Sequence, residues 1–163
     1  YEICACLVGS EMCIRDRAQE ELKVFERAVH DVLDLTMTSF KNGDLNLARQ
    51  VEPLEEVIDG LSLDVKQRHV RRLRKGKCTI ELGFILSDVI TNFERVSDHC
   101  SNIAVCLVQV NEDEFDTHAY LDELRQEDNK DFQSKVLACR EKYQLPPTKQ
   151  ERLAEKNAKL LAE

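Results

Sequence analysis

The sequence predicts an all-α fold, an antiparallel three-helix bundle followed by short C-terminal helices. Hydrophobic residues recur every three or four positions along three long segments, which is the period of a helix that packs one face on a core. The 163 residues include only 5 glycines and 3 prolines. So few chain-breaking residues argue against an all-β sandwich or barrel, which needs a turn about every 8–12 residues.

The first helix is expected over 18–41. Its apolar face consists of Leu22, Phe25, Val29, Val32, Leu33, Thr36 and Phe40. The helix should end at Asn42-Gly43-Asp44, because glycine suits a left-handed C-cap and the aspartate can cap the next helix.

The second helix is expected over 45–75 and the third over 78–110, with Gly76 between them. The apolar face of the second comprises Leu47, Val51, Leu54, Ile58, Leu61, Val65 and Leu73. That of the third comprises Leu82, Leu86, Val89, Ile90, Phe93, Val96, Cys100, Ile103, Ala104 and Leu107. Pro53 predicts a kink or a helix start close by. Two short glycine-containing turns make neighbouring helices antiparallel, so 18–110 is expected to form one bundle.

Beyond the bundle, 111–147 is expected to form an extension of short helices, one starting at Asp116 and another over 129–143. The tail 148–163 is charged and helical. It opens with Thr148 and Glu151 at the spacing of a capping box.

The first 17 residues differ from the rest of the chain. They show neither helical periodicity nor the three-part layout of a signal peptide. The stretch from Val8 to Arg17 resembles a translated sequencing-adaptor sequence, so we interpret 1–17 as a non-native tail of a fragment. The 7 cysteines include no paired C-x-x-C motif. We therefore expect unpaired thiols in a reducing compartment rather than disulfides or a zinc site.

Charge and hydropathy exclude further classes. With 23 Lys and Arg against 31 Asp and Glu, the net charge is -8, which argues against general nucleic-acid binding because phosphates would be repelled. No apolar run approaches the roughly 20 residues needed to span a bilayer, so this part of the protein is expected to be soluble.

Two carboxylate pairs have the same spacing. Glu55 and Asp59 lie four residues apart on the second helix, and Glu94 and Asp98 do so on the third. In an antiparallel hairpin that turns at Gly76, the two pairs lie at the same height. Four converging carboxylates repel unless a multivalent cation is bound, so these residues are the candidate metal ligands. His30, on the first helix, is level with them and is a further candidate.

A basic run closes the second helix. Its candidates for partner or membrane contact are Arg68, Arg71, Arg72, Arg74 and Lys75. One explanation is that cations suit a helix C-terminus and its dipole. The other is contact with anionic lipid headgroups, phosphate or an acidic partner.

The segment from Phe93 to Ala104 resembles the signature helix of PhoU-type domains, a hydrophobe followed by E-R-hydrophobe-small-D-H-x-x-N-I-A. Together with 115–118 and 142–146, it is similar to the C-terminal cytoplasmic part of bacterial sodium/phosphate cotransporters. The resemblance covers about 18–146. PhoU-type domains usually contain two three-helix repeats, and this chain resembles the last one.

The resemblance implies a regulatory domain that restrains or senses phosphate uptake, and not an enzyme. It assigns Glu94 and Asp98 to a divalent or polynuclear metal site, with iron the first expectation, and Glu55 and Asp59 match by spacing. It also implies, as partner, a transporter domain of the same full-length chain at the cytoplasmic face of the inner membrane. A homodimer remains open.

The alternative is a free-standing PhoU-type phosphate-signalling adaptor. The two interpretations differ in what precedes residue 18 in the full-length gene. A catalytic di-iron bundle is disfavoured, since such bundles chelate iron through E-x-x-H and the chain has no E-x-x-H.

Overall fold

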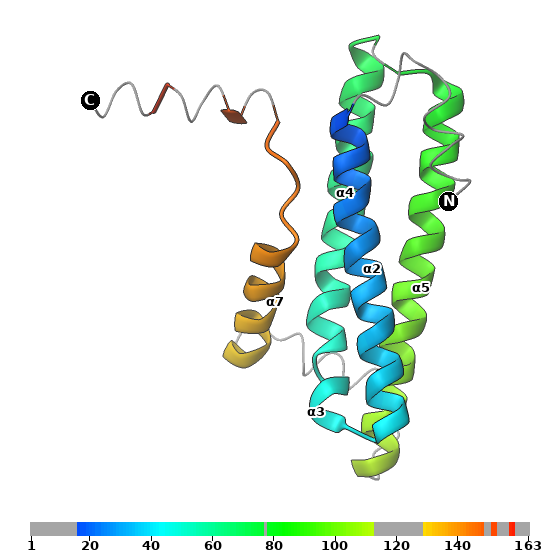
Figure 1. Cartoon of the computed structure of the whole chain (residues 1–163), viewed down its shortest axis with the longest axis vertical. Coiled ribbons are helices and arrows are strands. Elements are labelled where there is room, and N and C mark those ends of the chain that lie inside the picture. Colours follow the sequence, from blue (N-terminus) through cyan, green and yellow to red (C-terminus); the bar gives the residue numbers. More distant parts are fainter. Residues whose placement is uncertain (1–15, 77, 113–128, 149–150, 153–156, 159–163) are drawn as a thin grey trace.

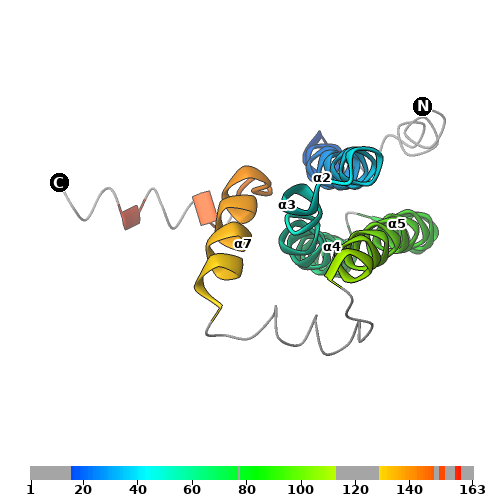
Figure 2. The ribbon, with the colours of Figure 1, turned by 90° about the horizontal axis from the view of Figure 1, so that it is seen from below.

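The computed structural model describes residues 16–76, 78–112, 129–148, 151–152 and 157–158. The helices are α2 Asp16–Asn42, α3 Leu45–Ala48, α4 Val51–Arg74, α5 Ile80–Glu112 and α7 Lys130–Lys142 (Figure 1). No strand occurs within these ranges. The predicted all-α fold is confirmed. The three long helices α2, α4 and α5 lie side by side, and α7 lies outside them, packed on α4 (Figure 2).

Both predicted turns are present. Gly43 and Gly76 have φ angles of 64° and 59°, the left-handed conformation that glycine adopts without steric cost. The side chain of Asp44 accepts hydrogen bonds from the backbone N–H groups of Asn46 and Leu47, and so caps α3.

The second predicted helix is divided into α3 and α4. Helix α4 begins at Val51, which places Pro53 in its first turn. Proline is tolerated there because the first backbone N–H groups of a helix have no partner within it. The expected helix start near Pro53 is therefore confirmed.

The core lies between the three long helices. Phe25, Ile58 and Ile90, one from each helix, have no exposed surface. The rings of Phe25 and Phe93 lie 5.7 Å apart between centroids and are tilted by 48°, which links α2 to α5.

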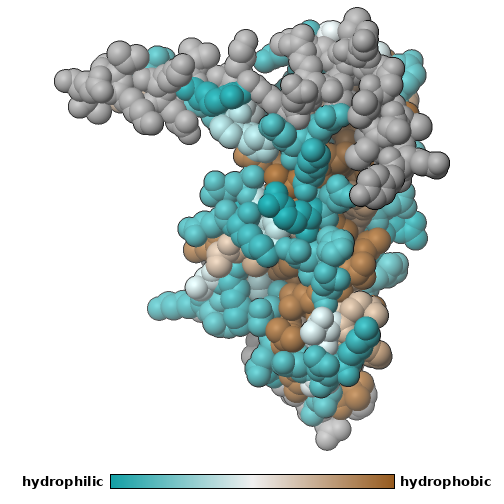
Figure 3. Space-filling model, viewed as in Figure 1, coloured by the Kyte–Doolittle hydropathy of each residue, from teal (hydrophilic) through white to brown (hydrophobic). Residues whose placement is uncertain are grey.

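Part of the predicted core face is exposed instead. Leu33, Phe40 and Ile103 keep 42%, 61% and 42% of their surface accessible. Their positions follow the helical rhythm, but two neighbours cannot cover an apolar stripe of that width. Areas of apolar surface between hydrophilic residues are visible along α2 and α5 (Figure 3).

The C-terminal part of the chain packs on the bundle through helix α7 and the extended segment that follows it. Helix α7 matches the predicted helix over 129–143, and its Phe132 and Val136 are buried in the shared core. The capping box is present: Thr148 N donates to Glu151 Oε2 at 2.6 Å, and Glu151 N donates to Thr148 Oγ1 at 3.3 Å. The helix expected from Asp116 lies outside the described residues, as does most of the N-terminal tail.

The prediction of unpaired thiols is correct for three cysteines and wrong for one. Cys100, Cys106 and Cys139 are free, whereas Cys78 is disulfide-bonded. Spacing alone could not predict that bond, because no second cysteine lies close to Cys78 in the sequence. Among the described helices, none is both long and apolar enough to cross a membrane.

Candidate metal centre

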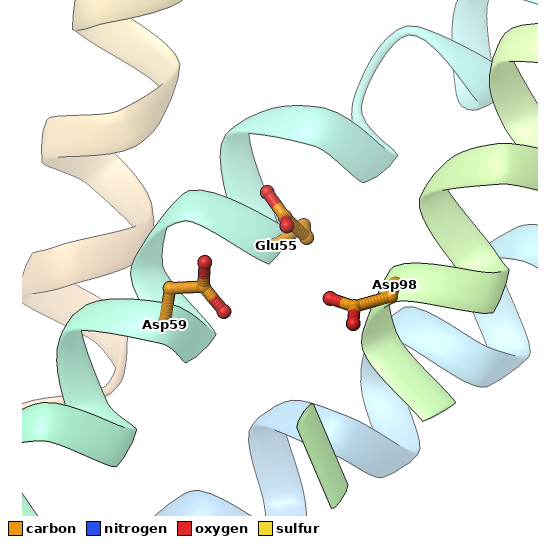
Figure 4. Close-up of side chains that lie close together, drawn as sticks. All are labelled: Glu55, Asp59 and Asp98. Atoms are coloured by element: carbon orange, nitrogen blue, oxygen red, sulfur yellow. The ribbon is translucent and has the colours of Figure 1, made fainter. Parts of the chain in front are cut away.

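Three of the four predicted carboxylates meet in the groove between α4 and α5. Glu55 and Asp59 project from α4 towards Asp98 on α5 (Figure 4). One oxygen from each of them lies within 4.8 Å of the others. Glu55 is buried, with 6% of its surface exposed, whereas both aspartates are exposed. The cluster therefore has one buried carboxylate and two that are exposed to solvent.

The helices position these side chains from the core outwards. Ile58, next to Asp59, is fully buried, and so is Ser97, next to Asp98. Each acidic residue thus follows or precedes a residue that faces the core, which places it on the flank of its helix. Four residues are slightly more than one helical turn, so Glu55 and Asp59 project from the same face.

The fourth predicted carboxylate, Glu94, lies in a separate ion pair. Ser62 Oγ donates a hydrogen bond to Glu94 Oε1, and Lys66 Nζ donates to Oε2 at 2.8 Å. Burial alone would raise the pKa of Glu94, but the hydrogen bonds from Lys66 and Ser62 outweigh it, and the pKa is lowered. The predicted convergence of all four carboxylates is therefore wrong for Glu94.

The direction of side chains in a helix explains this difference. Each Cα–Cβ bond tilts towards the N-terminus of its own helix. In an antiparallel pair the side chains of α4 and α5 therefore lean towards one another along the axis. Glu94 leans towards the Gly76 turn and reaches Ser62 and Lys66, while Asp98 reaches Asp59. The distance of each residue from the Gly76 turn predicted which residues of α4 and α5 are level with each other. It did not predict the direction in which their side chains lean.

A further buried carboxylate, Glu52, continues the groove. It is 3% exposed and accepts a hydrogen bond from Ser101 Oγ at 2.5 Å. Sequence reasoning did not single out Glu52 or Ser62, and it placed Lys66 in the basic run rather than beside the carboxylates. The signal that could have found them is helical spacing: Glu52 and Ser62 each lie three residues from one of the paired carboxylates, and Lys66 lies four residues beyond Ser62 on the same face of α4.

His30 is not part of the cluster. Its Nδ1 lies 3.2 Å from Asp34 Oδ2 on the same helix, and the two side chains are 71% and 70% exposed. It is level with the groove but faces solvent.

Two of the predicted contact residues in the basic run are engaged within the protein. Arg68 and Arg72 bind Glu21, with N–O distances of 3.3 and 2.7 Å, and the Glu21 side chain is only 5% exposed. Arg68 also donates to the carbonyl of Pro146 at 2.6 Å. The other three candidates, Arg71, Arg74 and Lys75, are exposed at the end of α4.

The sequence of the three long helices matches a known protein family. The family model of the PhoU domain matches residues 23–107, which run from α2 through most of α5 and include all three clustered carboxylates. This chain belongs to the PhoU domain family.

A curated relative is similar over part of its length. It is the phosphate-specific transport system accessory protein PhoU homolog 1 of Thermotoga maritima, 29% identical over 98 residues. The match covers 60% of this chain and 42% of the relative, so the chain spans less than half the length of that protein. No solved structure matches the chain.

Proposed function

We propose that this chain is a regulatory domain in the control of phosphate uptake, and that it binds a divalent metal ion through Glu55, Asp59 and Asp98. The observation that supports it best is the PhoU domain match, which covers the helices that carry this cluster. The Thermotoga maritima relative is named as an accessory protein of a phosphate-specific transport system.

The donor set fits a hard cation. Carboxylate oxygens suit iron(II), manganese, magnesium or calcium, whereas a thiolate would favour zinc or copper(I). The nearest cysteine in sequence to a proposed ligand, Cys100, is 3% exposed and belongs to the hydrophobic core. We propose iron first, in keeping with the resemblance to PhoU-type domains.

The role proposed for this ion is structural and regulatory rather than catalytic. A bound cation would neutralise the three carboxylates and join α4 to α5 at mid-height. Glu55, held in a buried position, would fix the ion's depth, while the exposed Asp59 and Asp98 would admit it from solvent. A partner that senses the α4–α5 surface would then distinguish the loaded from the metal-free domain.

Two arrangements of the full-length protein are compatible with this role. We favour a free-standing protein, because the matched relative is named as an accessory protein of a transport system and not as a transporter. The second is a domain of a sodium/phosphate cotransporter, because the segment 142–146 resembles the C-terminal part of such proteins in sequence. In that arrangement the exposed Arg71, Arg74 and Lys75 would face an anionic membrane, and vesicle binding that decreases steeply with salt would support it.

The metal site is tested by thermal melts of the purified chain with and without added Mn²⁺, together with elemental analysis. An ion that binds only the folded state stabilises it by about 2.7 kcal/mol at a hundredfold excess over Kd. Asp98→Asn should abolish most of this increment. Asp88→Asn, on an exposed part of the same helix, is the control and should retain it. A melt of the unmodified chain that does not respond to Mn²⁺ would refute the metal site.

A further inference from the structure

The groove between α4 and α5 contains its own cation, Lys66, which lies about two helical turns beyond Asp59 along α4. Along α4, Asp59 is followed by Ser62 and Lys66 at helical spacing, so the three lie on the same face. Ser62 has 1% of its surface exposed, and its hydroxyl is therefore fixed within the groove. Lys66 is half-buried, with 37% of its side chain exposed.

Both oxygens of Glu94 are used by these two residues. Ser62 holds Oε1, and the Lys66 ammonium holds Oε2 at 2.8 Å. Glu94 lies one turn before Asp98 on the same face of α5, so rotation of its side chain would direct the carboxylate towards the cluster. The ion pair with Lys66 holds it towards the Gly76 turn instead.

We propose that Lys66 withholds Glu94 from the metal and thereby limits the site to three carboxylates. This inference rests on the proposed function and assigns a residue that sets the affinity of that same site. The Lys66 ammonium supplies the positive charge that Glu94 would otherwise obtain from a bound metal ion.

The consequence is that removing the ammonium should strengthen metal binding through Glu94. In Lys66→Met the carboxylate loses its only charged partner in the described structure and can turn to the cluster, where a bound cation attracts it. A fourth carboxylate at the ion should raise the Mn²⁺ affinity at least tenfold. Lys66→Arg keeps both the charge and the hydrogen-bonding capacity, so it should bind Mn²⁺ as the unmodified chain does.

The experiment is a double-mutant cycle over Lys66 and Glu94, with Mn²⁺ binding measured by calorimetry and the bound ion followed by electron paramagnetic resonance. If Lys66 acts by withholding Glu94, Lys66→Met raises the affinity only when Glu94 is present. It should have little effect in the Glu94→Gln background. The loss of one positive charge, acting at a distance, would instead raise the affinity equally in both backgrounds.

The possible results separate this inference from the proposed site. If neither the unmodified chain nor any variant binds Mn²⁺, both are overturned. If the unmodified chain binds Mn²⁺ and Lys66→Met changes the affinity by less than threefold, or by the same factor in the Glu94→Gln background, only the role of Lys66 is overturned. A tenfold gain that requires Glu94 supports it.

Discussion

Carboxylates are compensated at the turn end of the α4–α5 hairpin but gathered together at its mid-height. Near the Gly76 turn, the buried Glu21 is matched by two arginines, with Arg72 at 2.7 Å and Arg68 at 3.3 Å. At mid-height of the groove, three carboxylates from two helices face one another within 4.8 Å. The first arrangement compensates a buried charge locally, as a stable fold requires. The second concentrates like charge, which folding alone does not favour.

The turn end also joins distant parts of the chain. Arg68 lies on α4, its carboxylate partner Glu21 on α2, and its carbonyl partner Pro146 after α7. The charges of this end therefore hold the C-terminal segment on the bundle. The basic run that suggested a contact surface is partly a structural element, and only its exposed members remain candidates for a partner.

Glu21→Gln should cause the largest change, because it breaks this network. Removing one partner of a buried ion pair leaves the other charge uncompensated, and typical losses are 3–5 kcal/mol. We expect the lower value, about 3 kcal/mol, since Arg68 and Arg72 keep 15% and 22% of their side chains exposed. Urea denaturation followed by circular dichroism measures the loss. Glu20→Gln, at the exposed neighbouring position, is the control. A loss equal to that of the control would mean that the network contributes little.

The turn end and the mid-height region also differ in how closely the helices pack. A Cβ at Gly83 would lie 2.9 Å from His69 Nε2, whereas a Cβ at Gly60, next to Asp59, would meet nothing within 4 Å. Alanine is favoured over glycine in a helix by about 1 kcal/mol, so Gly60→Ala should stabilise the protein by up to that amount. Gly83→Ala should destabilise it by about 1 kcal/mol, because overpacking costs more than the helix propensity contributes.

A second variant isolates the cause of the Gly83 effect. In a His69→Ala background the close contact is removed, and Gly83→Ala should become neutral or stabilising. Equal gains for Gly60→Ala and Gly83→Ala in the unmodified chain would show that the turn end packs no more tightly than the groove.

The fold could be predicted from the sequence because its determinants are local and periodic. The rhythm that includes Phe25, Ile58 and Ile90 predicted three core faces, and Gly43 and Gly76 predicted the two turns. The exposed Leu33 and Phe40 follow the same rhythm. Periodicity therefore predicts the side of a helix that is apolar but not how much of that side its neighbours cover.

For the candidate site, the sequence predicted which residues of α4 and α5 lie level with each other, but not all of their side-chain contacts. Equal distance from Gly76 correctly brought Glu55, Asp59 and Asp98 together. It failed for Glu94, because the contact with Lys66 depends on the lean of side chains along antiparallel helices and on the reach of a lysine. The pairing of Arg68 and Arg72 with Glu21 joins residues far apart in the sequence, and no spacing rule connects them.

The smallest effect is expected where α7 meets α2, and it depends on pH. Tyr143 and Lys142 both donate hydrogen bonds to Asp31 Oδ2. The hydrogen bond from Tyr143, followed by that from Lys142, lowers the pKa of Asp31 below its ordinary value of 3.8. A carboxyl whose pKa is lower in the folded state stabilises that state above the unfolded pKa and loses this contribution as the pH falls through the folded value. The docking of α7 should therefore weaken below about pH 4.

Tyr143→Phe tests this contact because it removes the hydroxyl and keeps the buried ring. We expect a loss of about 1 kcal/mol near neutral pH, the net value of one hydrogen bond, and a smaller loss once the pH has fallen through the lowered pKa of Asp31. Hydrogen exchange of the α7 amides, corrected for intrinsic rates, reports the docking. Asp131→Asn is the matched control, since Asp131 pairs with Lys135 within α7 and does not reach α2. A loss from Tyr143→Phe that stays constant while the pH falls through the titration of Asp31 would show that the hydroxyl stabilises α7 independently of the Asp31 charge.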